Sequence, residues 1–215
     1  MKNLKTVVIL IAVLLFTQVL FAQLLPTFII KGGISSASLT NKDEYVKYSE
    51  VGDNRVGYTF GLGVELPIAP IIKFETGLLY AQKGTKGKVL GVDVEFSPAY
   101  LEVPLGFRAV VKAGGIGVYG SLGTYLAYGI GGKTKGEFDL LGVNFSDSRD
   151  ISWGSDNGDD LKPFDFGFNV GAGVVLGQLE AGLYSSGSFI NISPVTNNDR
   201  TMRNIVFGVM FGYRI

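Results

Sequence analysis

Three glutamates, Glu65, Glu75 and Glu102, are the side chains of this 215-residue sequence that could carry acid and base chemistry. Two carboxylates held at different pKa values can act as a general acid and a general base. Basic residues recur in the same segments of the chain, at Lys31, Lys73, Arg108 and Arg214. Because each of these cations can neutralise a carboxylate, we interpret the glutamates as members of a structural ion network.

The segment from Gly115 to Gly120 reads Gly-Ile-Gly-Val-Tyr-Gly and has the glycine spacing of a dinucleotide-binding turn. Such a turn needs a strand before it and a helix after it, so that backbone amides point at the pyrophosphate. The residues up to Tyr128 continue a strand pattern instead. We therefore interpret these glycines as positions where a strand leaves space beside it.

The segment from Ser155 to Asp160 is rich in oxygen atoms and could hold calcium, which prefers carboxylate and carbonyl ligands. It lacks the twelve-residue loop that ends in a bidentate glutamate. A solvated turn at the tip of a long loop is the interpretation that we favour. The sequence thus predicts no catalytic residue, no metal site and no cofactor.

The composition excludes several classes of function. The chain has 19 basic and 19 acidic residues and no basic cluster, which argues against nucleic acid as a partner. It has no histidine, the usual proton carrier at neutral pH and the commonest metal ligand. It also has no cysteine, so its stability must come without disulfides. Both absences weigh against an enzyme.

The pattern that must position the charged residues is an alternation of apolar and small or polar side chains, seen most clearly from Val56 to Leu66. Strands with one apolar face repeat with a period of two residues. Eight segments show this period: 27–38, 56–66, 72–83, 99–111, 116–128, 164–176, 179–190 and 201–215. Tilted strands of roughly 9 to 11 residues cross a bilayer. We predict an all-β fold, an eight-stranded antiparallel up-and-down transmembrane β-barrel.

The connections between these segments alternate in length. Short turns lie at 67–70, 112–115 and 177–178, and longer polar connections lie at 39–55, 84–98, 129–163 and 191–200. Bacterial barrels place short turns in the periplasm and long loops outside the cell. The even number of strands then predicts that both ends of the barrel chain lie in the periplasm.

The faces of the strands predict where charge is buried. When the apolar side chains face lipid, ten charged residues fall on the opposite, lumen face: Lys31, Glu65, Lys73, Glu75, Lys83, Glu102, Arg108, Asp165, Glu180 and Arg214. Five are cations and five are anions, so a side-chain-filled lumen can pair them. Four outward tyrosines near strand ends are predicted to form aromatic girdles at the two membrane interfaces: Tyr58, Tyr80, Tyr128 and Tyr213.

Two long connections contain similar sequences. Thr85-Lys86-Gly87 precedes Leu90-Gly91-Val92-Asp93, and Thr134-Lys135-Gly136 precedes Leu141-Gly142-Val143-Asn144. We interpret each as a hairpin that extends two strands beyond the bilayer, with turns near residues 90–91 and 141–142.

The first 22 residues have the features of a secretory signal. Lys2 and Lys5 precede an apolar run from Val7 to Phe21, and Ala22 closes it. A membrane anchor helix is the alternative, but the run is short for a span of roughly 20 residues. We expect a signal peptide at 1–22, with a mature barrel domain at 23–215 that reaches the outer membrane.

Several segments, in this order, resemble the outer-membrane β-barrel proteins of the porin-family type, found in Bacteroidetes-like Gram-negative bacteria. They are Ile30-Lys31-Gly32-Gly33-Ile34-Ser35, Thr76 to Gly84, Tyr100-Leu101-Glu102-Val103-Pro104-Leu105, Asn191-Ile192 and the ending Phe211-Gly212-Tyr213-Arg214-Ile215. The resemblance covers most of the expected mature chain and places it in the eight-stranded size class of OmpX and OmpA. Members of this family more often end in Phe than in Ile.

The family name suggests transport, but eight strands enclose a lumen that side chains can fill, whereas water-filled porins have about 16 to 18 strands. We therefore expect a non-enzymatic, monomeric outer-membrane protein that contributes to envelope structure or surface interaction. Its expected partners are outer-membrane lipids, the barrel-assembly machinery and a surface ligand. The alternatives are a narrow channel for ions or small solutes and a soluble periplasmic ligand-binding barrel. Enzymes that resemble this size class rely on a catalytic histidine, which this chain lacks.

Overall fold

A computed structural model describes residues 25–43, 46–50, 53–89, 92–140, 143–195 and 201–215. The predicted signal segment, 1–22, lies outside these residues. None of the described residues forms a helix with the length and apolarity needed to cross a membrane. The strands of the described chain are β1 (Thr27–Asp43), β2 (Val46–Glu50), β3 (Asp53–Pro67), β4 (Ile72–Gln82), β5 (Thr85–Val89), β6 (Val92–Ala113), β7 (Ile116–Leu140), β8 (Val143–Asp150), β9 (Phe164–Leu176), β10 (Leu179–Ser188) and β11 (Thr201–Arg214).

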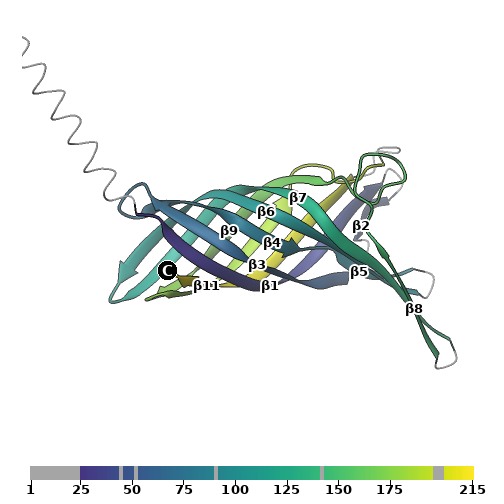
Figure 1. Cartoon of the computed structure of the whole chain (residues 1–215), viewed down its shortest axis with the longest axis horizontal. Coiled ribbons are helices and arrows are strands. Elements are labelled where there is room, and N and C mark those ends of the chain that lie inside the picture. Colours follow the sequence, from purple (N-terminus) through teal and green to yellow (C-terminus); the bar gives the residue numbers. More distant parts are fainter. Residues whose placement is uncertain (1–24, 44–45, 51–52, 90–91, 141–142, 196–200) are drawn as a thin grey trace, which may run out of the picture.

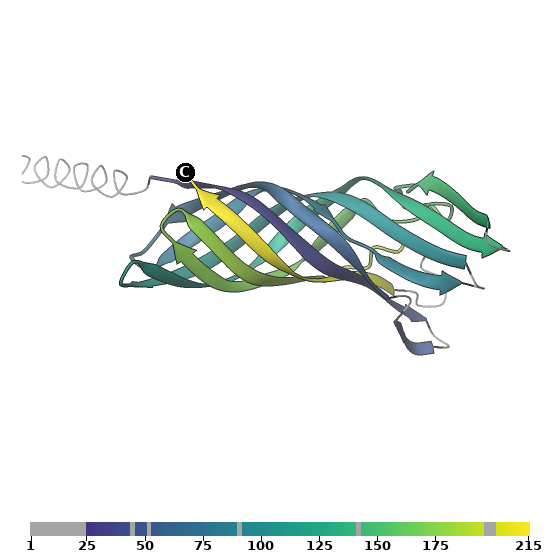
Figure 2. The ribbon, with the colours of Figure 1, turned by 90° about the horizontal axis from the view of Figure 1, so that it is seen from below.

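Eight of these strands close into a ring in which every neighbouring pair is antiparallel (Figures 1 and 2). The order around the ring is β1, β3, β4, β6, β7, β9, β10 and β11. The ring closes where β1 pairs with β11 from Ile29↔Arg214 to Lys42↔Thr201. Closure leaves no unpaired edge within the ring. The prediction of an eight-stranded antiparallel barrel is confirmed.

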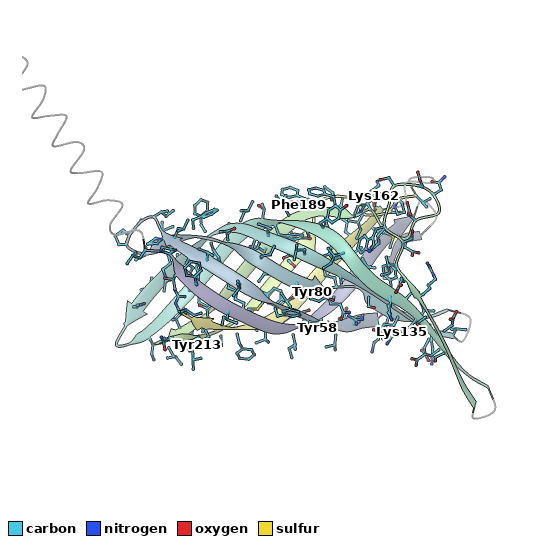
Figure 3. The ribbon with its side chains drawn as sticks, viewed as in Figure 1. Tyr58, Tyr80, Lys135, Lys162, Phe189 and Tyr213 are labelled. Carbon is cyan, nitrogen blue, oxygen red and sulfur yellow. The ribbon has the colours of Figure 1, made fainter. Side chains whose placement is uncertain are left out.

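The alternation of side chains has the predicted direction, with the apolar face on the outside of the wall. In β3, Tyr58, Phe60 and Leu62 are exposed, whereas Thr59 and Glu65 are buried in the lumen. Figure 3 shows the same arrangement around the barrel, whose outer surface is covered with projecting side chains. A soluble ligand-binding barrel would require the apolar face to point inward, which the structure contradicts.

The short turns lie at one end of the barrel, which we call the short-turn end. The turns between β6 and β7 and between β9 and β10 contain Gly114, Gly115 and Gly177, with φ angles of 57°, 87° and 61°. Residues with a side chain rarely adopt such angles, so glycine is needed at these positions. Both ends of the described chain also lie here, where Ile215 N donates a hydrogen bond of 2.8 Å to Phe28 O. The opposite end is the long-loop end.

The two predicted hairpins are confirmed at the long-loop end. β5 pairs with β6 up to Val89↔Val92, and β7 pairs with β8 up to Leu140↔Val143. The predicted turn residues, 90–91 and 141–142, lie outside the described residues. The β7–β8 hairpin projects far beyond the ring in Figure 1.

The prediction of a loop at 39–55 was wrong. β1 continues to Asp43, and β2 pairs with it from Thr40↔Glu50 to Asp43↔Val46. An antiparallel ladder is held by backbone hydrogen bonds, so it can continue after the apolar alternation of the sequence has ended.

The segment that connects β8 to β9 turns inward from the barrel wall. Both strands pair with β7, but residues 151–163 leave the wall between them. This segment, which we call the cap, is attached at its ends by hydrogen bonds from Ile151 N to Gly132 O (3.1 Å) and from Gly129 N to Pro163 O (2.7 Å). The cap carries Trp153 and is closed on itself by a bridge between Trp153 and Leu161.

Candidate functional site

A layer of ion pairs crosses the lumen near the short-turn end, with Glu65 of β3 at its centre. The Glu65 carboxylate accepts hydrogen bonds from Lys73 Nζ (2.6 Å) and Arg108 Nη1 (2.8 Å), and a third from Arg214. These cations lie on β4, β6 and β11. A fully buried carboxylate with three cationic partners has the charge compensation that burial requires.

The same layer includes a second carboxylate. Glu180 of β10 lies 3.0 Å from Arg108 Nη2 and 2.9 Å from Arg214 Nη1. Lys31 and Glu75 form an adjoining ion pair. We call this set the Glu65 layer: Lys31, Glu65, Lys73, Glu75, Arg108, Glu180 and Arg214.

The aromatic ring of Tyr119 packs against the Glu65 layer. The guanidinium carbon of Arg108 lies 3.5 Å from the centre of the Tyr119 ring, a cation–π contact. Tyr119 is buried with Val110 and Val175. Arg108 therefore joins β6 to β3, β7 and β10 through three different contacts.

A second layer crosses the lumen closer to the long-loop end. Lys83 Nζ lies 2.9 Å from Glu102 Oε2 and 3.7 Å from Asp165 Oδ2, and 4.1 Å from the centre of the Tyr125 ring. The centre of the Tyr100 ring lies 5.1 Å from the same ammonium group. We call this set the Lys83 layer: Lys83, Tyr100, Glu102, Tyr125 and Asp165.

Asp165 is held by neutral donors as well as by Lys83. Its Oδ2 atom accepts hydrogen bonds of 3.0 Å each from Tyr125, Ser188 and Asn204. Several hydrogen-bond donors that point at one buried carboxylate oxygen stabilise its negative charge. The Lys83 layer thereby links β6, β7, β9, β10 and β11.

The cap covers the Lys83 layer from the long-loop end. The Trp153 ring meets the Tyr100 ring edge-on, with centroids 5.2 Å apart. Gly129 of β7 makes room for it, because a Cβ atom at this position would lie 2.2 Å from Trp153 Cζ3. Farther out, Leu161 packs with Leu39 and Ile192. Trp153 and Leu161 therefore close the lumen with apolar side chains.

Two aspartates of the predicted oxygen-rich turn hold the cap in place. Asp160 accepts two hydrogen bonds from the Arg149 guanidinium, at 2.7 and 2.8 Å, and one from Ser152 N. Asp159 accepts hydrogen bonds from Ser152 Oγ and Asp156 N. These carboxylates already have protein partners, and no metal-binding group of acidic residues is found in the described part of the chain.

The hydrogen bonds also affect the acidity of Asp160. Partial burial raises the pKa of this carboxyl, but the bonds from Arg149 and Ser152 outweigh burial and lower the pKa below its usual range. The ionised form of Asp160 is therefore the form that the cap favours.

The structure brings together all ten charged residues that the sequence assigned to the lumen, since each takes part in an ion pair of one of the two layers. Tyr58 and Tyr80 stack outside the wall, 5.9 Å apart, and Tyr128 and Tyr213 are exposed. Their role as membrane girdles stays a prediction. The glycines from Gly117 to Gly120 lie within β7, so no helix follows them.

The sequence reasoning missed the cap. Its apolar residues, Ile151, Trp153 and Leu161, lie in a long polar connection and have no strand period. The one signal for it was the single tryptophan of the chain in an otherwise hydrophilic segment.

Comparisons with known proteins agree with this architecture. Residues 21–193 match the family described as "Outer membrane protein beta-barrel domain". No curated protein is significantly similar in sequence.

Solved structures with some likeness to the chain include two bacterial proteins. The attachment invasion locus protein Ail of Yersinia pestis has 15% identity and a TM-score of 0.42, over 88% of this chain and 98% of Ail. The outer membrane protein OprG from Pseudomonas aeruginosa has 17% identity and a TM-score of 0.42, over 89% of this chain and 97% of OprG.

Replacing Glu65 by Gln should destabilise the barrel strongly, because Lys73, Arg108 and Arg214 would lose the charge that compensates them. We expect a loss of about 3 to 5 kcal/mol in the free energy of unfolding, measured by urea titration in lipid vesicles. The control is Lys88→Gln, since Lys88 and Asp93 form an exposed pair at 3.5 Å. That change should cost about 0 to 1 kcal/mol. Equal losses in the two variants would contradict the layer's structural role.

Replacing Gly129 by Ala should displace Trp153 from the lumen, because the new methyl group would occupy the space of the indole ring. The fluorescence of Trp153, the single tryptophan, should shift to longer wavelength as the ring meets water. Gly131→Ala is the matched control on the same strand, because a Cβ atom at Gly131 would have open space within 4 Å. An unchanged Gly129→Ala spectrum would show that Trp153 does not pack there.

Acid should loosen the cap at a pH set by Asp160. The lowered pKa means that the Asp160 contacts stabilise the cap at and above about pH 4, where a free aspartate ionises, and are lost as the pH falls through the lower folded-state pKa. Trp153 fluorescence should report this transition. Asp160→Asn should abolish it, and an identical acid transition in that variant would assign the change to another group.

Proposed function

This chain belongs to the outer membrane protein beta-barrel domain family, and we propose that it is a non-enzymatic barrel with a closed lumen that contributes to envelope structure or surface interaction through its extended hairpins. The observation that carries the proposal is the filling of the lumen by two charged layers. Arg108 lies against Tyr119 in one layer, and Lys83 lies against Tyr125 in the other. Each layer places bulky side chains across the path that a solute would take.

The outer wall supports an integral position in the membrane. Large apolar side chains are exposed along the strands, among them Phe60, Leu122, Phe207 and Phe211 at 53 to 65%. Exposed apolar surface on this scale needs a lipid environment. Residues 1–22 fit a cleaved export signal, and the barrel-assembly machinery would then insert the chain as a monomer.

The contacts of the acidic residues support a structural role for them. Glu65, Glu180 and Asp165 each bind two or more cations or neutral donors inside the lumen. A general acid needs a proton at working pH and an approach path for a substrate. Carboxylates held by several partners below a covered mouth are better placed to join strands than to transfer protons to a substrate.

The hairpins present a polar surface at the long-loop end. Lys88 pairs with Asp93 across the β5–β6 hairpin, and Arg55 pairs with Glu95 at 2.7 Å. Lys135 and Glu137 add exposed charge on the neighbouring strand β7. Figure 3 shows Lys135 at this end of the molecule. Charged side chains on paired strands make a hydrophilic surface, which suits contact with an external ligand.

A narrow channel for ions or small solutes is the second candidate, and one observation favours it. A cavity of about 100 Å³ lies in the lumen and is lined by members of both layers. An open form would have to move both Arg108 and Lys83 away from their aromatic partners.

Electrical recording separates the two candidates. The protein, extracted from the outer-membrane fraction and shown to be folded by heat-modifiable gel migration, would be inserted into planar bilayers. We expect no stable openings above the bilayer background, because both layers block the lumen. Large, stable openings would overturn the closed-lumen proposal, and recovery of the protein in the soluble periplasm would overturn its membrane location.

A further inference from the structure

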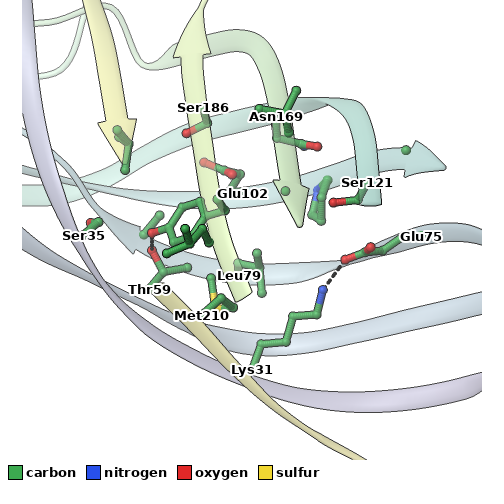
Figure 4. A pocket seen from close by; sticks show the side chains of 18 of the residues that line it. Lys31, Ser35, Thr59, Glu75, Leu79, Glu102, Ser121, Asn169, Ser186 and Met210 are labelled. Atoms are coloured by element: carbon green, nitrogen blue, oxygen red, sulfur yellow. Dashed lines mark hydrogen bonds and ion pairs between the residues drawn. The ribbon is translucent and has the colours of Figure 1, made fainter. Parts of the chain in front are cut away.

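A pocket of about 490 Å³ lies at the long-loop end, between the cap and the strands that extend beyond the ring. We call it the mouth pocket. Among the described residues, it shares no lining side chain with the cavity in the lumen, where Lys31, Glu75 and Glu102 of the charged layers lie (Figure 4). Its volume is within the range of about 300 to 1,000 Å³ that is typical of small-molecule sites.

Three strands of the ring supply apolar side chains to the mouth pocket: Leu39 of β1, Phe96 of β6 and Met202 of β11. Phe96 and Met202 are partly buried and pack against the buried cluster around Leu161 of the cap. Lipid covers the exposed apolar side chains on the outer wall of a barrel, but it does not reach the inside of the mouth. A ligand with an apolar body would cover this surface.

The charged side chains that line the mouth pocket leave one negative charge without a cationic partner. Both oxygens of Asp160 accept hydrogen bonds from the Arg149 guanidinium, so this pair has no net charge. Asp159 accepts hydrogen bonds from two neutral groups, Ser152 Oγ and Asp156 N, and it forms no ion pair in the described part of the chain. The mouth pocket therefore has a net negative charge, located at Asp159.

This charge determines which kind of apolar ligand the mouth pocket can accept. Asp159 is partly buried, and it still exchanges some hydrogen bonds with water. A neutral ligand would remove this water without replacing its hydrogen bonds, which costs free energy. An anionic ligand would add repulsion between like charges. A cationic group would instead replace the water by a charge-assisted hydrogen bond to the carboxylate.

We propose that the mouth pocket binds a small organic cation, an amine with an apolar body. The apolar body would lie against Phe96 and Met202, and the ammonium group would donate a hydrogen bond to the Asp159 carboxylate. The site rests on the surface-interaction part of the function proposed above, for which it names a class of ligand. It does not depend on whether the lumen is closed.

Three probes of similar shape and different charge test the class of ligand. Phenethylamine is a cation at neutral pH, phenethyl alcohol is neutral and phenylacetate is an anion. Equilibrium dialysis of each radiolabelled probe would compare the full protein in phosphatidylcholine nanodiscs with empty nanodiscs. We expect saturable binding of one phenethylamine per barrel, about ten times tighter than that of the alcohol, as one charge-assisted hydrogen bond predicts. Phenylacetate should show no saturable binding. Absence of saturable phenethylamine binding, or equal affinity for the alcohol, would overturn the proposal.

Substitutions in the cap locate the bound amine. Asp159→Asn should abolish the preference for phenethylamine over the alcohol. Asp156→Asn is the matched control, because it removes the same charge from an exposed aspartate that does not line the mouth pocket, and it should leave the preference unchanged. Asp159 also contributes to the cap, so Asn157→Lys provides a second test. This exposed residue lines the mouth pocket, and a lysine there would compensate Asp159 without removing its hydrogen bonds.

Heat-modifiable migration identifies the variants that are folded. A full preference for phenethylamine in folded Asp159→Asn or Asn157→Lys protein would place the amine elsewhere and overturn the proposal. The dialysis and the electrical recording can fail separately. A barrel that stays closed in planar bilayers but binds no phenethylamine would overturn the mouth pocket alone. A barrel that conducts and still binds the amine through Asp159 would overturn the closed lumen alone.

Discussion

The buried carboxylate of Glu65 is the constraint on which the barrel depends. It binds Lys73, Arg108 and Arg214, so one side chain of β3 ties together strands that are far apart in the sequence. A shift of one residue in the register of β3 would turn Glu65 toward lipid and would place Leu66 inside the lumen. Ionised side chains that face lipid near the midplane of a barrel are costly. The ion layer therefore stabilises this register and penalises its nearest alternatives.

The second constraint lies in β7, which must serve two different neighbours. Its first half pairs with β9, and its far half pairs with β8. Gly129 lies between these two halves, at the level where the cap turns inward. Because Gly129 has no side chain, the Trp153 ring packs directly against its backbone. An extra residue in β7 opposite Ala99 and Tyr100 shifts the β6–β7 register at the same level. The irregular part of the barrel is thus confined to the place where the cap enters.

The parts of this structure that the sequence predicted are those that follow a period of two. Glu65, Glu102 and Asp165 could be assigned to the lumen because each lies on the face opposite a run of apolar residues. The cap could not be predicted in this way, since the contact between Trp153 and Gly129 joins residues of different segments and leaves no local pattern. The continuation of β1 and β2 beyond the apolar alternation was missed because backbone hydrogen bonds, which every sequence offers, hold it together.

Coupling between Glu65 and Arg214 tests the central claim most directly. These residues come from β3 and β11, 149 positions apart, and meet only if the ring is closed as described. A double-mutant cycle with Glu65→Gln and Arg214→Gln, followed by urea unfolding in lipid vesicles, measures their interaction free energy. We predict a coupling of about 1 to 3 kcal/mol, because each change leaves the other's partner uncompensated. Additive effects, with a coupling below about 0.5 kcal/mol, would contradict a lumen held together by the Glu65 layer.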